Sequence, residues 1–166
     1  MSALDATDRS ILRILQRDGR MTYAALADEL GLTATPTLQR VRKLEEAGVI
    51  KSYVALLDRA AVGRETMVWV QVTLREHDRK RHIGFIEAMN AFPEVVEVHH
   101  VAGVEADFIL KVVVRGIAEY EDWLVHKLIE IPGFDRVHST FVLSTSKSET
   151  AIPIDPEPEH DTSTPD

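Results

Sequence analysis

The 166-residue sequence predicts an α+β protein with two domains: a helical N-terminal third and a longer domain of alternating strands and helices. Three helical patterns, each followed by a glycine, occupy the first 48 residues. Beyond residue 64 the apolar pattern follows the order β-α-β-β-α-β. This order is typical of the ferredoxin-like split βαβ arrangement, in which both helices cover one face of a four-stranded antiparallel sheet.

The composition suits a folded domain protein, because 45% of the residues are hydrophobic and 28% are charged. We expect a cytoplasmic location, since no run of 18 apolar residues and no secretion-signal pattern occurs. The absence of cysteine excludes disulfides, thiolate metal sites and cysteine nucleophiles.

The net charge of −8 is unevenly distributed along the chain. Residues 1–60 hold nine Lys or Arg and eight Asp or Glu, whereas residues 61–166 hold ten and nineteen. Because the acidic part repels a polyanion, we expect any nucleic-acid contact to be made by the N-terminal third.

The first two helices carry start and stop signals. Asp5 is a good N-cap with Asp8 in the first turn, and Gly19 ends this helix, whose apolar residues recur at helical spacing: Ile11, Leu12, Ile14 and Leu15. Thr22 can cap a shorter helix that Gly31 ends.

The third helix lies in LTATPTLQRVRKLEEAGVI, residues 32–50. Thr33 or Thr35 caps it, Pro36 lies in its first turn, and it ends before Gly48. A helical wheel predicts a buried side formed by Leu38, Val41 and Leu44, with Thr37 at its edge.

A short helix, a glycine turn and a basic helix form the helix-turn-helix pattern. On the helical wheel Pro36 points outward. Gln39 and Arg40 can form paired hydrogen bonds with base edges. The residues that can bind phosphate oxygens are Thr33, Thr35, Arg42 and Lys43. On charge alone a basic surface helix is more often merely solvated. The preceding helix and turn favour the DNA interpretation.

Beyond the third helix, IKSYVALLD reads as a strand and DRAAVG as a linker. In the next strand, Val68, Val70 and Val72 alternate with a row that contains Met67 and Trp69. We expect the following helix to bury Ile83, Ile86 and Met89. Because helices cover only one face of the sheet, both apolar rows cannot be buried within one chain, so we expect pairing through the sheet as a homodimer.

These patterns divide the chain into four segments. We expect a DNA-binding domain over residues 1–57, a linker or hinge over 58–64, a ferredoxin-like domain over 65–147 and an acidic, proline-rich disordered tail over 148–166.

The N-terminal residues resemble those of the Lrp/AsnC family of transcriptional regulators. The family pattern LS-x-TP-x-x-x-RV-x-x-LE-x-x-GVI-x-x-Y is matched here by Leu32, Thr33, Thr35, Pro36, Arg40, Val41, Leu44, Glu45, Gly48, Val49, Ile50 and Tyr53. The similarity continues through FPEVVEVHHVAG, EADFILKVVV, YEDWLVHKLIEIPGF and STFVLSTSKSE, and so covers about residues 4–152.

This resemblance implies a sequence-specific regulator with a winged helix-turn-helix domain and a RAM or AsnC-type effector domain. It further implies homodimers, often assembled as octamers of four dimers, with a small effector, usually an amino acid, bound between dimers near the loop VAGVEADF. The implied effector residues are Gly103, Val104, Glu105, Asp107 and Thr140. The family form of this loop has glycine three residues before the aspartate, where this chain has Val104.

Two alternatives stay open. Sirohaem decarboxylases resemble the same two-domain architecture, and His99 and His100 lie in a strand near the expected pocket; however, adjacent strand residues face opposite sides and no metal-ligand spacing accompanies them. The other alternative is a nucleoid-compacting protein that uses the same DNA contacts. The prediction is a non-enzymatic regulator without metal or resident cofactor.

Overall fold

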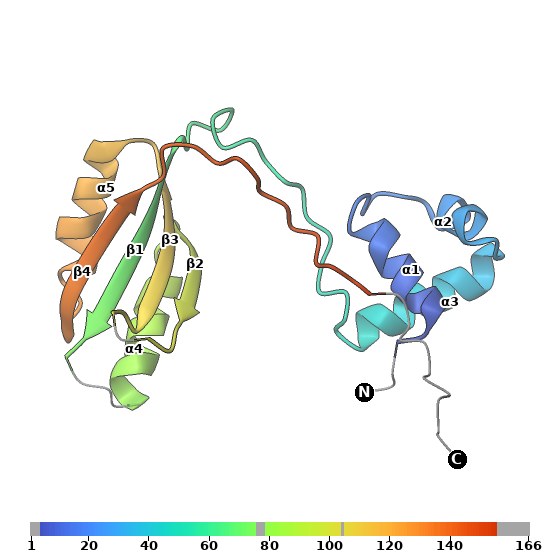
Figure 1. Ribbon diagram of the computed structural model, residues 1–166, viewed down its shortest axis with the longest axis horizontal. Coiled ribbons are helices and arrows are strands. Elements are labelled where there is room, and N and C mark those ends of the chain that lie inside the picture. Colours follow the sequence, from blue (N-terminus) through green and yellow to red (C-terminus); the bar gives the residue numbers. More distant parts are fainter. Residues whose placement is uncertain (1–3, 76–78, 104, 156–166) are drawn as a thin grey trace, which may run out of the picture. The chain divides into compact units, whose positions relative to one another are not determined.

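The computed structural model describes residues 4–75, 79–103 and 105–155, which form two compact units (Figure 1). One unit combines residues 1–56 with 147–166, and the other spans Leu57–Ser146. The first contains α1 (Ala6–Leu15), α2 (Tyr23–Leu30) and α3 (Ala34–Glu46). The second contains β1 (Thr66–Leu74), α4 (Arg79–Asn90), β2 (Val95–His100), β3 (Phe108–Val114), α5 (Ile117–Trp123), the π-helical turn η1 (Leu124–Leu128) and β4 (Phe134–Phe141). Within the described residues, no helix has the length and apolar character needed to cross a bilayer.

The helix starts of the first unit follow the sequence prediction. Asp5 and Asp8 form a reciprocal capping box, in which the Asp8 N–H donates to Asp5 at 2.8 Å. Thr22 accepts from the Ala25 N–H at 3.2 Å, and Gly31 ends α2 in the left-handed conformation with φ of 66°.

The buried side of α3 differs from the prediction. Thr37, Val41 and Leu44 form it, whereas Leu38 is only half-buried. Thr37 is fully buried. Its burial leaves its hydroxyl satisfied, because the hydroxyl donates to the Thr33 carbonyl at 3.0 Å. The hydrogen bond within its own helix therefore allows a threonine where the wheel placed a leucine.

The strand predicted for IKSYVALLD is absent from the described structure. Residues 51–58 have no strand assignment, and Val54, Leu56 and Leu57 are each at least 70% exposed. Tyr53 ties the start of this segment to α3, since its hydroxyl donates to Glu45 at 3.0 Å. Burial and the Glu45 carboxylate raise the pKa of Tyr53 to about 12, so the hydroxyl keeps its proton at neutral pH.

The second unit has the predicted β-α-β-β-α-β order. Its antiparallel sheet has the strand order β2-β3-β1-β4. The core lies between the helices and one face of this sheet, where Val68, Val70 and Val72 of β1 are completely buried. The row containing Trp69 therefore occupies the face without helices.

The register of α4 also differs from the prediction. Phe85 and Met89 are buried in the core, while Ile83 is 45% exposed. The aromatic ring of Phe85 packs 4.7 Å from that of Phe108, and this contact fixes which side of α4 faces the sheet.

The segment expected to be a linker is a closed turn. The Ala61 N–H donates to the Asp58 carboxylate at 2.8 Å, and Gly63 N–H donates to the Ala60 carbonyl at 2.9 Å. Arg64 then binds both carboxylate oxygens of Glu119, at 2.9 and 3.0 Å. Residues 58–64 are thus internally bonded and joined to α5 of the same unit.

Part of the expected tail packs on the first unit. The side chain of Gln16 hydrogen-bonds both backbone groups of Ile152, at 2.5 and 3.1 Å, and Arg9 donates to the Asp155 carbonyl at 3.2 Å. Ile154 packs against the three-helix core. The side chain of Ile154 and the backbone hydrogen bonds of Ile152 and Asp155 explain why residues 152–155 lie against the first unit, while the Ile152 side chain is exposed. The rest of the tail, residues 156–166, lies outside the described residues.

Glu119 makes the stability of the second unit depend on pH. The Arg115 N–H, the Arg115 side chain and Arg64 together lower the pKa of Glu119 to about 2. A depressed pKa contributes stability that is present above the ordinary value of 4.5 and is lost as pH falls toward 2. We expect Glu119→Gln to cost about 1–2 kcal/mol at pH 7, as loss of charge-assisted hydrogen bonds does, and progressively less below pH 4.5.

Urea unfolding followed by tryptophan fluorescence measures this effect selectively. Both tryptophans of the chain, Trp69 and Trp123, lie in the second unit. Glu121→Gln changes an exposed carboxylate of the same helix and is the matched control. A difference between Glu119→Gln and the parent chain that stays constant from pH 7 to pH 3 would contradict this account.

Candidate functional site

The exposed side of α3 contains most of the residues predicted to contact DNA. Thr33, Thr35, Pro36, Gln39, Arg42 and Lys43 are all exposed. Thr33 occupies the N-cap position of α3 without forming a side-chain capping bond. The first N–H groups of α3 therefore keep their capacity to bind an anion, and the helix dipole favours negative charge at this end.

A shallow hollow of about 480 Å³ borders the same side of α3 within the first unit. It separates the start of α1, at Leu4 and Asp5, from Pro36, Gln39 and Lys43. The side chains of Gln39 and Lys43 consequently stand beside open space and are not packed against α1.

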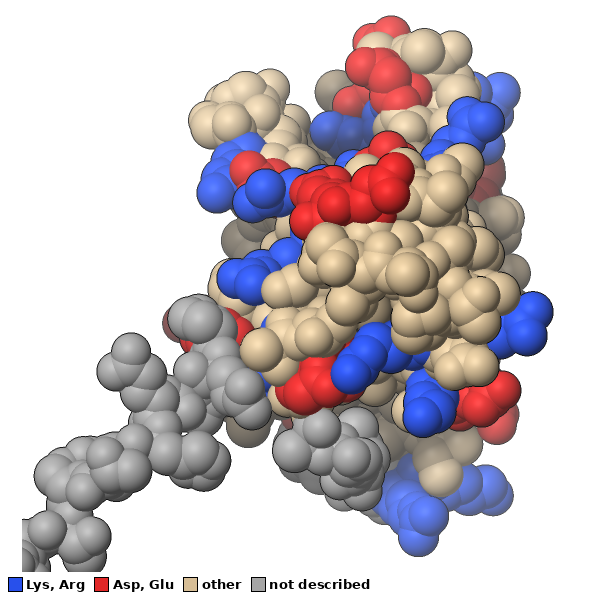
Figure 2. All heavy atoms as spheres, turned by 90° about the vertical axis from the view of Figure 1, so that its right-hand side faces the viewer, with Lys and Arg blue, Asp and Glu red and all other residues tan. Residues whose placement is uncertain are grey.

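The charges on the face of the molecule shown in Figure 2 are mixed. In the face shown in Figure 2, Lys and Arg side chains are interleaved with Asp and Glu around a wide uncharged area. This agrees with the near balance of nine basic and eight acidic residues in positions 1–60. Attraction to a polyanion must therefore come from particular side chains, since no single basic patch dominates this face.

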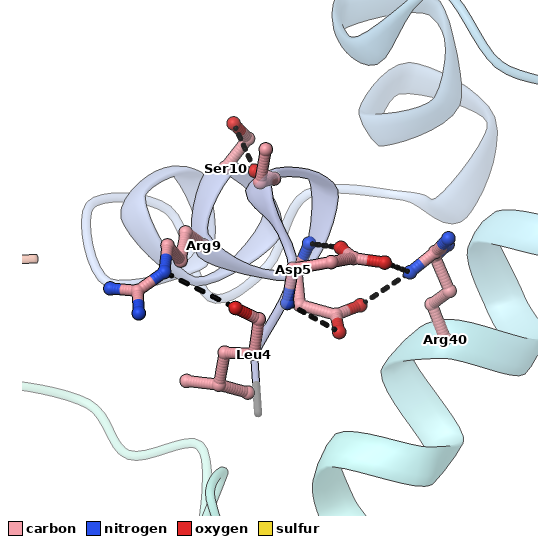
Figure 3. A network of polar contacts seen from close by, with 7 residues as sticks. Leu4, Asp5, Arg9, Ser10 and Arg40 are labelled. Atoms are coloured by element: carbon pink, nitrogen blue, oxygen red, sulfur yellow. Dashed lines mark hydrogen bonds and ion pairs between the residues drawn. The ribbon is translucent and has the colours of Figure 1, made fainter. Parts of the chain in front are cut away.

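Arg40 has a different environment from its neighbours on α3. Its guanidinium reaches toward the start of α1, where Nη1 lies 2.6 Å from Asp5 and 2.8 Å from Asp8 (Figure 3). The hydrogen bonds that Arg40 donates to these two carboxylates raise the pKa of Arg40. The Asp8 N–H, followed by Arg40, lowers the pKa of Asp5. The sequence predicts that Arg40 contacts base edges; in the structure its guanidinium joins α3 to the capping box of α1.

A sequence signal for this ion pair exists. Two aspartates three residues apart at a helix start place two carboxylates on one side of the first turn. Their capping role accounts for one oxygen of each, and the remaining oxygens face α3, where Arg40 meets them. Helix periodicity alone does not reveal this pairing, because it depends on how α1 and α3 pack.

The effector loop predicted between β2 and β3 is held by Asp107. Its carboxylate accepts from the Leu74 N–H at 2.7 Å, and its own N–H donates to the Val72 carbonyl at 2.9 Å. The Thr73 hydroxyl donates to the Glu105 carbonyl at 3.0 Å. Asp107 thus anchors the loop to the end of β1, which is the structural role that an aspartate before a strand commonly has.

The other predicted effector residues are only partly brought together. Gly103 and the Glu105 side chain are exposed in the loop, and Val104 lies outside the described residues. Gly103 does not adopt a positive φ. Thr140 pairs with Trp69 on β1, four to five residues from the loop contacts at Thr73 and Leu74. At about 3.3 Å per residue, this places Thr140 well away from the loop within one chain.

The histidine pair divides between the two faces of the sheet, as predicted. His99 lies 3.0 Å from Glu97 on the face without helices, and the His100 ring stacks 5.2 Å from Phe108 on the helix side. In the described part of the chain, no three His, Asp or Glu side chains are grouped as metal ligands. The contacts of His99 are thus with a carboxylate, and those of His100 are with an aromatic ring.

The helix-free face of the sheet contains a network that the sequence did not reveal. Lys111 donates to Glu97 at 2.8 Å and lies 5.8 Å from the centre of the Trp69 ring. Half-buried Ile109 and Val113 adjoin these residues on β3. This face thus has an apolar centre with charged neighbours, which is the anatomy of a protein–protein interface. Cross-strand register brings these residues together, and a single-strand pattern does not specify register.

Comparison with known proteins identifies relatives over nearly the whole chain. Residues 67–152 match the family model described as the Lrp/AsnC ligand binding domain, and residues 4–51 match a winged helix-turn-helix DNA-binding model. The "Leucine-responsive regulatory protein" of Rhizobium meliloti is 37% identical over 91% of this chain and 96% of its own length. The "Bkd operon transcriptional regulator" of Pseudomonas aeruginosa is 37% identical over 93% of this chain and its whole length.

Solved structures agree with these matches. An AsnC family transcriptional regulator from Agrobacterium tumefaciens has a TM-score of 0.85 and 38% identity, over 90% of this chain and 96% of its own. A transcriptional regulator of Neisseria meningitidis, solved as an L-Met complex, has a TM-score of 0.86 and 29% identity, over 91% and 97% of the two chains. These relatives are named as regulators, and the decarboxylase alternative is not favoured.

The Arg40 ion pair predicts an energetic coupling between α1 and α3. We expect Arg40→Ala and Asp8→Asn each to destabilise the first unit, and the double variant to be less destabilised than the sum by about 0.5–1 kcal/mol, the range for partly exposed ion pairs. Native-state hydrogen exchange at the buried Leu12 and Val41 amides measures this. Arg13→Ala, which removes an exposed cation from α1, serves as the control. Strictly additive effects would show that the pair is not coupled.

Proposed function

The chain belongs to the Lrp/AsnC family and is a DNA-binding transcriptional regulator with an effector-binding domain, and we propose that it binds duplex DNA through the exposed side of α3. The observation that carries this proposal is the exposure of Gln39, Arg42 and Lys43 next to an α3 N-terminus without a side-chain cap. The N-terminal half of the helix enters the major groove, as in other helix-turn-helix proteins.

The exposed residues divide into two kinds of contact. Gln39 offers an amide that forms paired hydrogen bonds with adenine and is assigned to base reading. Arg42, Lys43 and the hydroxyls of Thr33 and Thr35 are assigned to phosphate oxygens, while Pro36 lies against the groove wall. Arg40 is a positioning residue in this scheme, because its ion pairs with Asp5 and Asp8 hold α3 against α1.

The helix-free sheet face is proposed as the homodimer interface. Trp69, Ile109 and Val113 are half-buried in the single chain, and a second copy would remove their remaining apolar surface from water. Twofold pairing also supplies the two DNA-binding domains that a helix-turn-helix protein needs for two half-sites. Further assembly to an octamer of four dimers is part of this proposal and rests on the family alone.

The effector is proposed to be an amino acid that binds at the loop of residues 101–107. The Neisseria relative is described as an L-Met complex, and that description concerns that protein. Here Glu105 is exposed for an ammonium group. The Asp107 carboxylate already accepts a hydrogen bond from the Leu74 N–H, so in this proposal it supports the loop and contributes its negative charge to the effector site. Thr140 joins the site only from another chain, because it lies far from the loop within its own.

The base and phosphate assignments predict different responses to mutation. Arg42→Ala and Lys43→Ala should weaken binding to all duplexes by the same factor and each reduce the salt slope of log affinity by about 1. Gln39→Ala should cost about 1–3 kcal/mol on the preferred duplex alone and so relax specificity. The measurement is fluorescence anisotropy on a duplex selected by the parent protein from a random pool, compared with a scrambled duplex.

Arg13→Ala again serves as the control, because it removes a cation outside α3. The DNA assignment fails if Gln39→Ala retains the full preference for the selected duplex, or if Arg42→Ala and Lys43→Ala behave like Arg13→Ala.

The sheet-face interface predicts that Trp69→Asp yields monomers that bind DNA poorly, since a carboxylate buried between two sheets is costly. Sedimentation velocity measures the mass of the particle. Ile117→Asp is the matched control, because Ile117 is an apolar residue 71% exposed at the start of α5, on the helix side. A stable Trp69→Asp dimer would rule out this face as the interface.

A further inference from the structure

A cavity of about 880 Å³ lies between α4 and η1, within the second unit. Its apolar wall comes from Phe85, Ala88, Phe92, Ile131 and Pro132. Both this volume and this lining are in the range found for small-molecule sites, which are mostly apolar with a few polar groups. In the proposed effector loop, none of the described residues, 101–103 and 105–107, lines this cavity.

The charged residues of the cavity are predominantly cationic. The cations are Lys80 and Arg81 in the first turn of α4 and Lys127 in η1, and the His126 ring lines the cavity beside Lys127. Glu130 is the one carboxylate among the lining residues that the structure describes. Three cations and one carboxylate thus line the cavity, whereas acidic residues outnumber basic ones in the second unit as a whole.

Lys127 is held in a fixed position at this site. Its ammonium lies 2.6 Å from Glu94 and 5.8 Å from the centre of the Phe92 ring. A cation placed beside an aromatic ring presents charge and apolar surface together. A ligand that has a negative group next to an apolar body would match this pair.

Gly84 is the second independent feature of the cavity. It lies in the middle of α4 and lines the cavity, and a Cβ built on it would meet nothing within 4 Å outside its own helix. Its φ is not positive, so neither packing nor backbone conformation requires glycine. Glycine inside a helix destabilises it relative to alanine. The absence of a side chain at Gly84 therefore leaves the adjacent cavity open.

We propose that this cavity binds a small monocarboxylate with an aromatic or branched apolar body and no ammonium group. The apolar body lies between Phe85 and Phe92, beside Gly84, and the carboxylate faces Lys127 and the cationic first turn of α4. An ammonium group would be repelled by these cations, because Glu130 is the one carboxylate among the described lining residues and the nearby Glu94 is already paired with Lys127. The ligand class therefore differs from the amino acids proposed for the 101–107 loop, and the inference does not rest on that assignment.

The test measures the binding of three probes that share one carbon skeleton to the full-length protein. These are 3-phenylpropionate, L-phenylalanine, which adds an ammonium group, and 3-phenylpropanamide, which lacks the charge. Calorimetry measures affinity, and hydrogen–deuterium exchange locates each ligand. We expect 3-phenylpropionate to protect residues 79–92 and 124–133 and to bind there at least tenfold more tightly than either analogue. Protection confined to residues 101–107, or equal affinity of the three probes, would overturn the proposal.

Two variants then connect the binding to the cavity. Gly84→Leu fills it and should weaken 3-phenylpropionate binding at least tenfold, while Asn90→Leu, an exposed α4 position that does not line the cavity, should leave it unchanged. Gly84→Ala should raise the thermal midpoint of the second unit, because alanine favours the helix. Unchanged affinity in a folded Gly84→Leu protein would overturn the proposal. If that variant does not fold, the probe series on the parent protein still decides the matter.

Discussion

The alternation of side chains between the two faces of β1 is the constraint on which the structure of the second unit depends. A strand sends successive side chains to opposite faces, so burying Val68, Val70 and Val72 under α4 and α5 forces Trp69 onto the other face. Because β1 lies between β3 and β4, its register also sets the partners of Trp69, which are Lys111 and Thr140. The helix side then has the packed core and the cavity, and the other side has the apolar surface that a second chain can cover. One pattern of alternation thus places the cavity and the apolar surface around Trp69 on opposite sides of the sheet.

In the first unit, the arrangement of the helices depends in a comparable way on the two carboxylates at the start of α1. The N-cap of α1 needs a carboxylate, and two aspartates in one turn provide more acceptor capacity than the cap uses. Arg40 uses the remainder and thereby connects the capping box to α3. A sequence motif for DNA binding can thus include a residue whose charge is directed inward. The neighbouring Gln39, Arg42 and Lys43 are exposed because Arg40 and the buried Thr37 fix the rotation of the helix.

Local patterns predicted the element order and the caps, whereas packing decided the details that they missed. The order β-α-β-β-α-β and the caps at Asp5 and Thr22 depend on signals within a few residues, and both are found in the structure. Thr37 replaces Leu38 on the buried side because its hydroxyl is satisfied within the helix. Phe85 replaces Ile83 because Phe108 lies opposite. The partners of Arg40 and Asp107 lie 32 to 35 residues away. No periodicity within a helix or strand specifies such contacts.

The charge of the chain makes pairing a physical requirement of the proposed DNA binding. With nine basic and eight acidic residues in the first 60, a single domain has little net attraction for a polyanion. The charge of Arg40 is in addition balanced by its ion pairs with Asp5 and Asp8. A few phosphate contacts per domain give weak, salt-sensitive binding. Two domains held together bind with an effective concentration set by their connection, so the second contact adds affinity without new residues. The acidic second unit then disfavours nonspecific contact with DNA. A weakly binding domain joined to an acidic one would therefore be selective only as the proposed dimer, and assembly through the proposed sheet-face interface would then control DNA binding.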